Sequence, residues 1–534
     1  MTADRFANTT ALNSARREAE LRQLGVDGSP QEELDLVVIG GGITGAGIAL
    51  DAVTRGLSVV LLEKHDLAFG TSRWSSKLAH GGLRYLSKGR VGIARHSALE
   101  RGRLMKHNAP HLVRALAQVT PLDKGTNLFQ KAAVRAGYYA GDLLRASAHT
   151  PGSILPQSAR VDRRRALELC PTARQEGLKG AWVNYDGQMI DDARMVTAVA
   201  RTAAREGAKI LTYCEVLEAT GKSVRVRDTL GDRTFDFAAH GVVNATGVWA
   251  GGLDPNIHIK PSRGTHLVLD AAALGNPTGA LTVPLPGSVS RYLFAMPEQL
   301  GRVYLGLTDV ETPGEIPEVP DTPEEDVDFL LENFNKYLER KLTRDDVLGT
   351  FTGIRPLIDD GEGGESADVS RKHATIVAEN GLVSIVGGKF TEYRQMAEEA
   401  VDEVVRLQDL HAGDCRTANF PLVGAPKHRD SLRVRDADLI GLPKSMIDRF
   451  GYEAPAVMAS CTMENPLGKV AGLTITCAEL EYAATHEGAL TVDDILDRRT
   501  RIGLVPADRE RALAAAEEAL EAAKVEVGRA AGEA

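Results

Sequence analysis

The chain has 534 residues, of which 43% are hydrophobic and 25% charged, an ordinary composition for a folded protein. This length exceeds what a single hydrophobic core normally serves, so we expect more than one domain. The formal net charge of −10 argues against binding to a nucleic-acid backbone, which needs an excess of Lys and Arg, and an anionic substrate would require a local cluster of positive charge.

The first 33 residues read as an N-terminal extension with a short charged helix predicted over 15–24. They lack the apolar core and cleavage site of a secretion signal. No run of about 20 apolar residues occurs, so no transmembrane helix is predicted. The five cysteines are scattered and form no CxxC pair, and no metal-ligand cluster stands out. This pattern favours a reducing, cytoplasmic location without a zinc site.

Residues 34–63 have the order of elements that a βαβ unit requires. An apolar run at 34–39 predicts a buried strand, and the glycine-rich sequence GGGITGAG follows at 40–47. Apolar residues at helical spacing continue over 48–53, and a second strand is predicted over 57–62, directly before Glu63. A glycine-rich turn by itself is common, but these elements in register predict a dinucleotide-binding site.

Each glycine of this motif has a physical role. Gly40 permits the tight turn, Gly42 lets the backbone approach a pyrophosphate, and Gly45 allows the helix to pack closely on the strand. The helix that begins near Thr44 points its positive end at the pyrophosphate. Glu63 stands where a carboxylate accepts hydrogen bonds from ribose hydroxyls, which disfavours NADP but does not separate NAD from FAD.

The segment 71–86 reads TSRWSSKLAHGGLRYL. Its hydroxyl, glycine and basic residues suit a loop that cradles a polyanion, although an ordinary solvated loop has a similar composition. Residues 75–86, together with the glycine motif, resemble the signature of FAD-dependent, quinone-linked glycerol-3-phosphate dehydrogenases, which belong to the D-amino-acid-oxidase-like flavoproteins. Further matches follow in unbroken order as far as residue 396: DDAR at 191–194, VNATGVW at 243–249, RGTH at 263–266, GLTD at 306–309, GIRPL at 353–357 and GGKFTEYR at 387–394.

The resemblance implies that the cofactor is FAD. The residues expected to bind it are Gly40, Gly42, Thr44, Gly45, Glu63, Thr71, Ser72, Ser76, Lys77, Leu78, Gly247 and Gly388.

The resemblance also implies a reaction, in which sn-glycerol 3-phosphate loses a hydride to the flavin and becomes dihydroxyacetone phosphate. The residues expected to be catalytic are His266, Arg355 and Lys389, and those expected to bind substrate are Arg84, Tyr85 and Arg371. A neutral imidazole at His266 would take the hydroxyl proton while Arg355 stabilises the alkoxide. A histidine on a strand is also a common core residue, and an ordinary surface charge is the less favoured alternative for Arg371.

Two positions depart from the family pattern. Glu392 replaces a residue that is usually Thr, and its carboxylate either weakens the contact of Lys389 with phosphate or points to solvent. Arg263 replaces a usual Lys, which keeps the charge but changes the donor geometry.

The remaining segments carry weaker signals. Residues 127–149 predict an amphipathic helix with basic flanks, which fits a membrane interface or packing on the protein's own core. The acidic, proline-rich stretch 311–328 reads as a surface loop with solvated charges. Residues 419–426 resemble a linker, and helices are predicted over 474–484 and 506–527, as in the helical cap domain of the same family.

These observations predict an α/β protein with a Rossmann-like FAD-binding domain of the D-amino-acid-oxidase-like type, a mixed-sheet substrate-binding portion and a C-terminal all-α cap domain. The expected division is an extension at 1–33, an oxidoreductase domain at 34–410 and a helical domain at 411–534. By resemblance, the electrons pass to a membrane quinone, either menaquinone or ubiquinone. The protein would then bind peripherally to the inner face of the cytoplasmic membrane, and the resemblance allows a homodimer.

Three alternatives remain open on the sequence. A soluble glycerol-3-phosphate oxidase would reduce oxygen in place of quinone. An amine or amino-acid oxidase of the broader group would lack the cations that bind phosphate. A non-catalytic flavin-binding sensor would hold a flavin that the substrate does not reduce.

Overall fold

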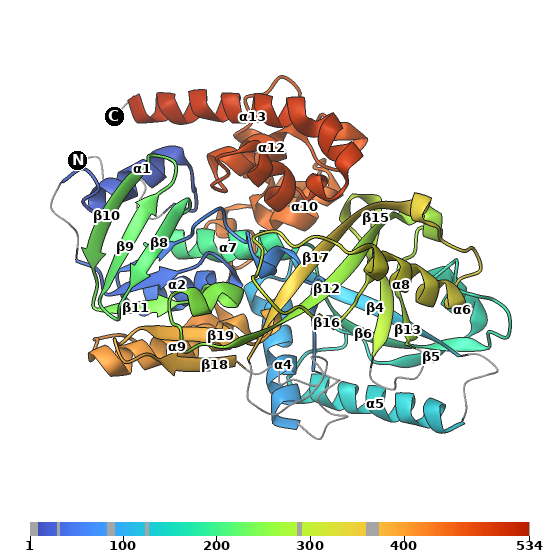
Figure 1. Ribbon diagram of the computed structural model, residues 1–534. Helices are drawn as coiled ribbons and strands as arrows, with labels where there is room; N and C mark the ends of the chain where they lie inside the picture. The colour runs from blue at the N-terminus through green and yellow to red at the C-terminus, as the bar shows by residue number, and fades with distance from the viewer. Residues whose placement is uncertain are drawn as a thin grey trace.

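The computed structural model describes residues 9–28, 33–82, 91–122, 128–285, 291–358 and 373–532. Three sheets and a helical layer make up this part of the chain (Figure 1). The first sheet has the strand order β18-β19-β11-β1-β2-β7, and it is parallel except for β18, which runs antiparallel to β19. Its strands are β1 (Leu36–Ile39), β2 (Val59–Leu62), β7 (Lys209–Leu211), β11 (Gly241–Asn244), β18 (His373–Val377) and β19 (Val383–Gly387).

This sheet is covered on both faces, which explains why β1 and β2 are apolar at every position. Leu36 and Val38 of β1 share a core with helices on one face, whereas Val37 and Ile39 belong to a separate core on the other. The helices of the first face are α2 (Ile43–Thr54), α7 (Asp192–Arg205) and α9 (Tyr393–Gln408). The second face is covered by α1 (Ser14–Gln23) and by the antiparallel sheet of β8 (Cys214–Ala219), β9 (Ser223–Asp228) and β10 (Arg233–Ala238).

The large mixed sheet follows the order β16-β12-β15-β14-β13-β4-β6-β3, with β17 also paired to β12 and β5 to β6. Its strands are β3 (Leu78–Ala79), β4 (Val113–Leu122), β5 (Ala159–Val161), β6 (Gly180–Met189), β12 (Ile259–Asp270), β13 (Ala280–Pro284), β14 (Tyr292–Glu298), β15 (Arg302–Gly306), β16 (Val310–Glu311) and β17 (Val347–Ile358). The associated helices are α4 (Val91–Arg103), α5 (Leu128–Ser147), α6 (Arg163–Leu169) and α8 (Glu324–Phe334). Helices α6 and α8 supply apolar residues to one core with this sheet.

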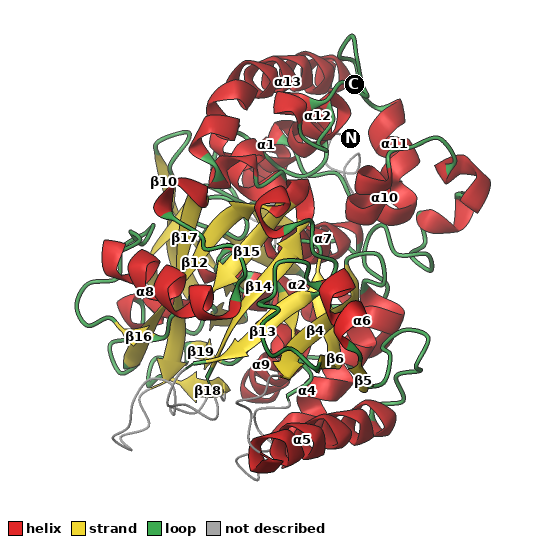
Figure 2. Ribbon diagram, turned by 90° about the vertical axis from the view of Figure 1, so that its right-hand side faces the viewer, coloured by secondary structure: helices red, strands yellow, loops and turns green. Residues whose placement is uncertain are grey.

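The C-terminal part forms a helical layer above both large sheets (Figure 2). Its helices are α10 (Lys444–Phe450), α11 (Ala454–Ala459), α12 (Cys477–Thr485) and α13 (Pro506–Gly532). The predicted helix over 506–527 corresponds to α13, which begins at the expected proline and continues to Gly532. The predicted fold class, an α/β portion with a mixed sheet followed by an all-α part, is confirmed.

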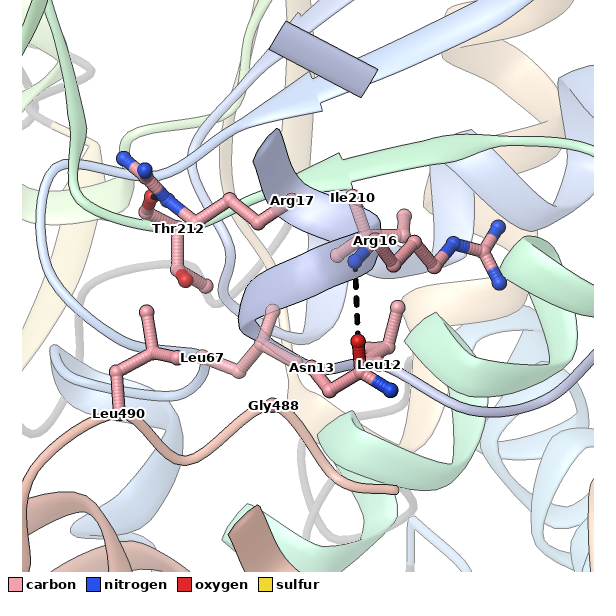
Figure 3. A pocket seen from close by; sticks show the side chains of 9 residues that line it. All are labelled: Leu12, Asn13, Arg16, Arg17, Leu67, Ile210, Thr212, Gly488 and Leu490. Atoms are coloured by element: carbon pink, nitrogen blue, oxygen red, sulfur yellow. Dashed lines mark hydrogen bonds between the residues drawn. The ribbon is translucent and has the colours of Figure 1, made fainter. Parts of the chain in front are cut away.

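Helix α1 joins the first sheet to the helical layer. The backbone of Leu12, just before α1, exchanges hydrogen bonds with His486 and Gly488 of the C-terminal part. Arg16 and Arg17 of α1 point along opposite sides of the helix toward the residues around β7 (Figure 3). A small cavity of about 10 Å³ between these elements holds about one water molecule, so it is not a substrate site.

Within the described part of the chain, no helix is both long enough and apolar enough to cross a bilayer.

Candidate active site

The turn between β1 and α2 can be made only by glycine at two positions. Gly40 has φ +109°, and a Cβ there would lie 2.6 Å from the Ala245 carbonyl oxygen. A Cβ at Gly45 would lie 1.9 Å from the Gly40 carbonyl oxygen. Gly42 caps α2 and has no side chain that could bond the first amides of the helix. This arrangement suits a pyrophosphate at the helix N-terminus.

Glu63 lies at the carboxyl end of β2, beside this turn. Its carboxylate accepts hydrogen bonds from the backbone N–H of Gly41 at 2.6 Å and of His65 at 2.9 Å. Burial raises the pKa of Glu63 above its ordinary value, although both hydrogen bonds act in the opposite direction. The carboxylate is therefore held next to the glycine turn, where ribose hydroxyls could donate to it.

The loop after Glu63 connects the glycine turn with the large sheet. The Ser72 hydroxyl accepts a hydrogen bond from the backbone N–H of Ile43, at the start of α2, at 3.0 Å. The Thr71 hydroxyl donates to the Ile354 carbonyl oxygen of β17 at 2.7 Å. The Ser76 hydroxyl lies 3.1 Å from Nε2 of His266 on β12. Three predicted cofactor residues thus bridge the nucleotide end of the site to its predicted catalytic end.

Lys77 and Leu78, also predicted to bind the cofactor, turn their side chains into the protein. Nζ of Lys77 donates to Asp192 at 2.7 Å and to two backbone carbonyls of the same loop. Leu78 is buried in a small apolar cluster of the large sheet. The backbone of Lys77 is also engaged, since its N–H donates to the Ser75 hydroxyl at 3.1 Å and its carbonyl oxygen accepts from the N–H of Met189 at 2.7 Å. The structure therefore shows these two residues supporting the loop, and their predicted contact with the cofactor stays a prediction.

The two remaining predicted glycines also fit a close approach. Gly247 follows β11 with φ +62°, and a Cβ there would meet open space. Gly388 follows β19 with φ +78°, and a Cβ there would lie 2.5 Å from the Met396 sulfur. Both positive φ values favour glycine over any other residue. The residues of this region fit a bound dinucleotide.

His266 lies on β12 and is only 1% exposed. Its ring stacks on Phe351 of β17 with the ring centres 4.5 Å apart. Burial, followed by the positive charges of Lys77 and Arg355, lowers the pKa of His266 well below its ordinary value. The imidazole is therefore neutral at physiological pH, as a general base must be.

Arg355 lies on β17, directly opposite Ser262 of β12. It donates to the Ser262 hydroxyl at 3.1 Å and pairs with Asp309 at 3.3 Å. A Cβ at Gly264 would lie 2.2 Å from Nη2 of Arg355, so the glycine makes room for the guanidinium two residues before His266. The structure thus brings these two predicted catalytic residues together on neighbouring strands.

Lys389 begins the turn from β19 to α9. Its Nζ donates to the Ser97 hydroxyl of α4 at 2.8 Å and to Glu392 at 3.0 Å. Glu392 is buried and also accepts a hydrogen bond from Ser97 at 2.5 Å. Of the two alternatives for this unusual residue, the structure therefore excludes a carboxylate that points to solvent.

Three predicted substrate residues, Arg84, Tyr85 and Arg371, lie outside the described residues. Asp309 and Asp326 had no predicted role. In the structure Asp309 forms an ion pair with Arg355, and Asp326 forms one with Arg263, three residues before His266. Asp309 ends the GLTD match and could have been noticed there. Asp326 belongs to the stretch 311–328, whose charges were interpreted as solvated, and for Asp326 this interpretation is wrong, because the residue is 4% exposed.

Comparison with known proteins agrees with this geometry. A family model described as FAD dependent oxidoreductase matches residues 35–419, and one described as the C-terminal domain of alpha-glycerophosphate oxidase matches residues 415–533. Glycerol-3-phosphate dehydrogenase 1 of Mycobacterium tuberculosis is 55% identical over 517 residues, which cover 96% of this chain and 99% of that protein. Glycerol-3-phosphate dehydrogenase 2 of the same species is 33% identical, covering 92% and 84%.

Solved structures show the same relationship. The crystal structure of glycerol-3-phosphate dehydrogenase from Bacillus halodurans complexed with FAD has a TM-score of 0.70 and 28% identity, covering 98% of this chain and 97% of that one. The L-alpha-glycerophosphate oxidase from Mycoplasma pneumoniae, with a TM-score of 0.54 and 16% identity, shares the fold over 73% of this chain.

The glycine turn, the sheet that carries it and the family match define an FAD-dependent oxidoreductase of the D-amino-acid-oxidase-like type. The predicted cofactor, FAD, is thereby confirmed. The similarity extends through the helical C-terminal part, and the chain belongs to the family of FAD-dependent glycerol-3-phosphate dehydrogenases.

Proposed function

We propose that this protein oxidises sn-glycerol 3-phosphate to dihydroxyacetone phosphate and passes the electrons to a membrane quinone, menaquinone or ubiquinone. The observation that carries the proposal is a buried, neutral His266 beside Arg355, joined through Ser76 to the loop that meets the cofactor-binding turn. Bound FAD supplies the hydride acceptor. The protein's own residues supply orientation, positive charge and a place for the hydroxyl proton.

His266 receives the proton of the substrate's secondary hydroxyl at Nε2, the ring atom that faces the Ser76 loop. Nδ1 then carries the proton of the neutral ring. Nδ1 is buried and has no hydrogen-bond partner among the described residues. No hydrogen bond at Nδ1 therefore favours a different orientation of the ring. Arg355 cannot act as a base, because a guanidinium stays protonated, and its charge stabilises the oxygen that becomes negative.

The phosphate end of the substrate is assigned to Lys389, with Arg84, Tyr85 and Arg371 as its partners by resemblance. A phosphate dianion in a protein of net charge −10 needs such a local group of cations. A hydrogen bond connects this end of the site with the loop after Glu63, since the backbone N–H of His80 donates to the Thr391 hydroxyl at 3.1 Å. Residues 80–82 are thereby held close to the turn that carries Lys389.

Helix α5 supports docking on a membrane surface, which a quinone-reducing enzyme requires. Leu144 faces the protein, whereas Tyr139 is 66% and Leu143 56% exposed on the outer face. Arg135 is exposed one turn before Tyr139, so this face combines a basic group with apolar side chains, as interfacial helices do. The helix lies at the edge of the molecule opposite the helical layer (Figures 1 and 2). The exposed face of α5 supports membrane contact, and the inner face of the cytoplasmic membrane is proposed from the resemblance to the family.

The reaction is tested by adding glycerol 3-phosphate to the flavin-loaded protein without oxygen and following the flavin absorbance. The wild type should bleach within the turnover time. His266→Gln should bleach about 10²- to 10⁴-fold more slowly with unchanged flavin content. The control, His258→Gln, changes an exposed histidine and should leave the rate unaltered. A wild-type rate in His266→Gln would remove the base assignment, and a flavin that never bleaches would favour the sensor alternative.

The electron acceptor is tested on the reduced enzyme. Rapid reoxidation by a water-soluble quinone, with slow production of peroxide in air, is the expected result. Fast peroxide production without a response to quinone would instead identify an oxidase.

Membrane docking is tested by cosedimentation with anionic vesicles. The double variant Tyr139→Asp and Leu143→Asp should stay in solution. Leu230→Asp, an equally exposed site at the turn between β9 and β10, should sediment as the wild type does. Equal sedimentation of both variants would rule out α5 as the contact.

A further inference from the structure

Asp326 is a buried carboxylate in the first turn of α8. Its neighbours Glu324 and Glu325 in the same turn are exposed, but Asp326 is turned into the large sheet. Buried carboxylates are rare unless they are paired and hydrogen-bonded. Asp326 is therefore expected to have several hydrogen-bond donors around it.

Four donors from two segments reach this carboxylate. Arg263 of β12 donates through Nε at 3.0 Å and Nη2 at 3.2 Å, one to each oxygen. The Thr265 hydroxyl donates at 2.6 Å and the Thr308 hydroxyl at 3.2 Å. The Thr308 hydroxyl also accepts from the backbone N–H of Thr265 at 2.9 Å. Asp326 thus ties residues 263–265 to Thr308 with charge-assisted hydrogen bonds.

Each of these two segments adjoins or contacts a residue assigned to the reaction. Thr265 directly precedes His266 on β12. The Thr308 carbonyl oxygen accepts from Nη2 of Arg355 at 3.4 Å, and the next residue, Asp309, pairs with the same guanidinium. Asp326 therefore adds a side-chain link between the surroundings of His266 and those of Arg355, beside the direct pairing of β12 with β17.

We propose that Asp326 is a positioning residue that holds the base His266 and the cation Arg355 at a fixed separation. The inference rests on the roles proposed above for these two residues. Asp326 itself meets neither substrate nor flavin and acts only through its neighbours. Because misplacement of a reacting group by about 1 Å can reduce a rate about 10²-fold, loss of this carboxylate should mainly reduce kcat.

The test compares Asp326→Asn with Asp328→Asn. The control lies on the same helix, carries the same substitution and forms an exposed ion pair with Arg344. Asp326→Asn should lower kcat about 10- to 100-fold, with FAD content unchanged and a smaller effect on KM. Asp328→Asn should match the wild type. Equal kinetics of the two variants would overturn the proposal.

A double variant separates positioning from a general structural role. Once His266→Gln has removed the base, Asp326 has nothing left to position there. Adding Asp326→Asn should then lower the rate of flavin reduction by less than about threefold, because residues that act as a unit are not additive. If the two substitutions reduce the rate of flavin reduction by factors that multiply in the double variant, Asp326 only supports the fold. A wild-type rate in His266→Gln alone would instead refute the proposed base.

Thr308→Val provides a milder change in case Asp326→Asn does not fold. It keeps the Arg263 pair with Asp326 and removes only the hydroxyl that links Asp326 with Thr265. We expect a drop in kcat of about 3- to 10-fold, with FAD retained, because the two hydrogen bonds of this hydroxyl are lost while the bonds of Asp326 to Arg263 and Thr265 remain. An unchanged kcat in this variant would also contradict the proposal.

Discussion

Glu392 stands where the resemblance to the family leads us to expect Thr, and the structure shows what its carboxylate contacts. Its carboxylate is buried and lies 3.0 Å from Nζ of the half-buried Lys389. A negative charge at this distance cancels part of the attraction that Lys389 offers to a phosphate. The pair should therefore weaken substrate binding without altering the hydride transfer step.

We predict that Glu392→Gln lowers KM for glycerol 3-phosphate about 3- to 10-fold, because a charge interaction of this kind near a protein surface is worth about 1 kcal/mol or more. Its kcat should change little. The control is Glu399→Gln, which removes an exposed carboxylate that pairs with His373 from α9, the helix that begins directly after Glu392. Steady-state kinetics measure KM and kcat in both variants. A higher KM in Glu392→Gln would contradict the prediction and mean that the carboxylate holds Lys389 in the orientation that binds phosphate.

Glu298, at the end of β14, offers a pH-dependent measurement. Burial raises the pKa of Glu298 to about 8, against the lowering effect of a hydrogen bond from Gln188 and the charges of Lys77 and Arg114. The folded carboxyl therefore keeps its proton at a pH at which the unfolded carboxyl has lost it. Its contribution to stability is present below the unfolded pKa and is lost as the pH rises through about 8.

Glu298→Gln stays neutral at every pH, so it should lack this loss. Between about pH 5 and about pH 9, the free energy of unfolding should fall by a few kcal/mol more in the wild type than in the variant. Chemical denaturation at the two pH values measures the difference. Parallel pH dependence in the two proteins would contradict the raised pKa.

At the scale of elements, the cofactor loop after Glu63 is held by the C-terminal helical part. Asp66 of this loop accepts hydrogen bonds from Arg498 at 2.7 Å and from both terminal nitrogens of Arg499 at 2.8 and 2.7 Å. Burial by itself would raise the pKa of Asp66, but the two arginines outweigh it and lower the pKa. Arg501 adds a hydrogen bond to the Arg73 carbonyl oxygen at 2.6 Å. The helical layer is therefore part of the support for the FAD site.

We predict that Asp66→Asn raises the dissociation constant for FAD about tenfold or more, because breaking a buried ion pair costs about 3–5 kcal/mol and part of that cost falls on the loop. The control, Asp493→Asn, removes an exposed partner of Arg509 in the neighbouring turn. Release of fluorescent flavin on dilution measures the affinity. Wild-type affinity in a less stable Asp66→Asn protein would show that the arginines serve stability alone.

At the scale of the whole molecule, α1 acts as a connection between layers. Its Arg17 forms a buried ion pair with Asp228 of β9 at 2.6 Å and donates to the Thr212 carbonyl oxygen at 2.8 Å. Residues just before α1 bind the C-terminal part through Leu12 and through Asn13, whose side chain donates to the Thr485 carbonyl oxygen at 3.1 Å. Residues 9–28, the described part of the predicted N-terminal extension before residue 33, are thus built into the fold.

Arg17→Met should lower the free energy of unfolding by about 3 kcal/mol, because Asp228 stays buried with less compensation. The control is Arg225→Met. Arg225 lies on the same strand as Asp228 and forms an exposed ion pair with Asp236 of β10, and its loss should leave the free energy of unfolding close to the wild-type value. Thermal and chemical unfolding compare the two. Similar costs would contradict the role of α1 as a connection.

Much of the fold could be predicted because its signals are local. The strands β1 and β2, the glycine turn, Glu63 and the helix α13 each depend on residues within one short stretch of chain. The same holds for the motifs that indicated the family. The expected domain boundaries at 33/34 and 410/411, and the individual site residues, stay predictions.

By itself, the sequence determined the α/β fold class, the FAD cofactor and the family, since glycine spacing and strand patterns act over a few neighbouring residues. Only the tertiary structure decided which charges are buried and with whom they pair. Arg499 meets Asp66 across 433 positions of the chain, and Asp326 meets Arg263 from inside an acidic stretch that looked solvated. Such partners are chosen by packing between distant segments, and no local pattern records that choice.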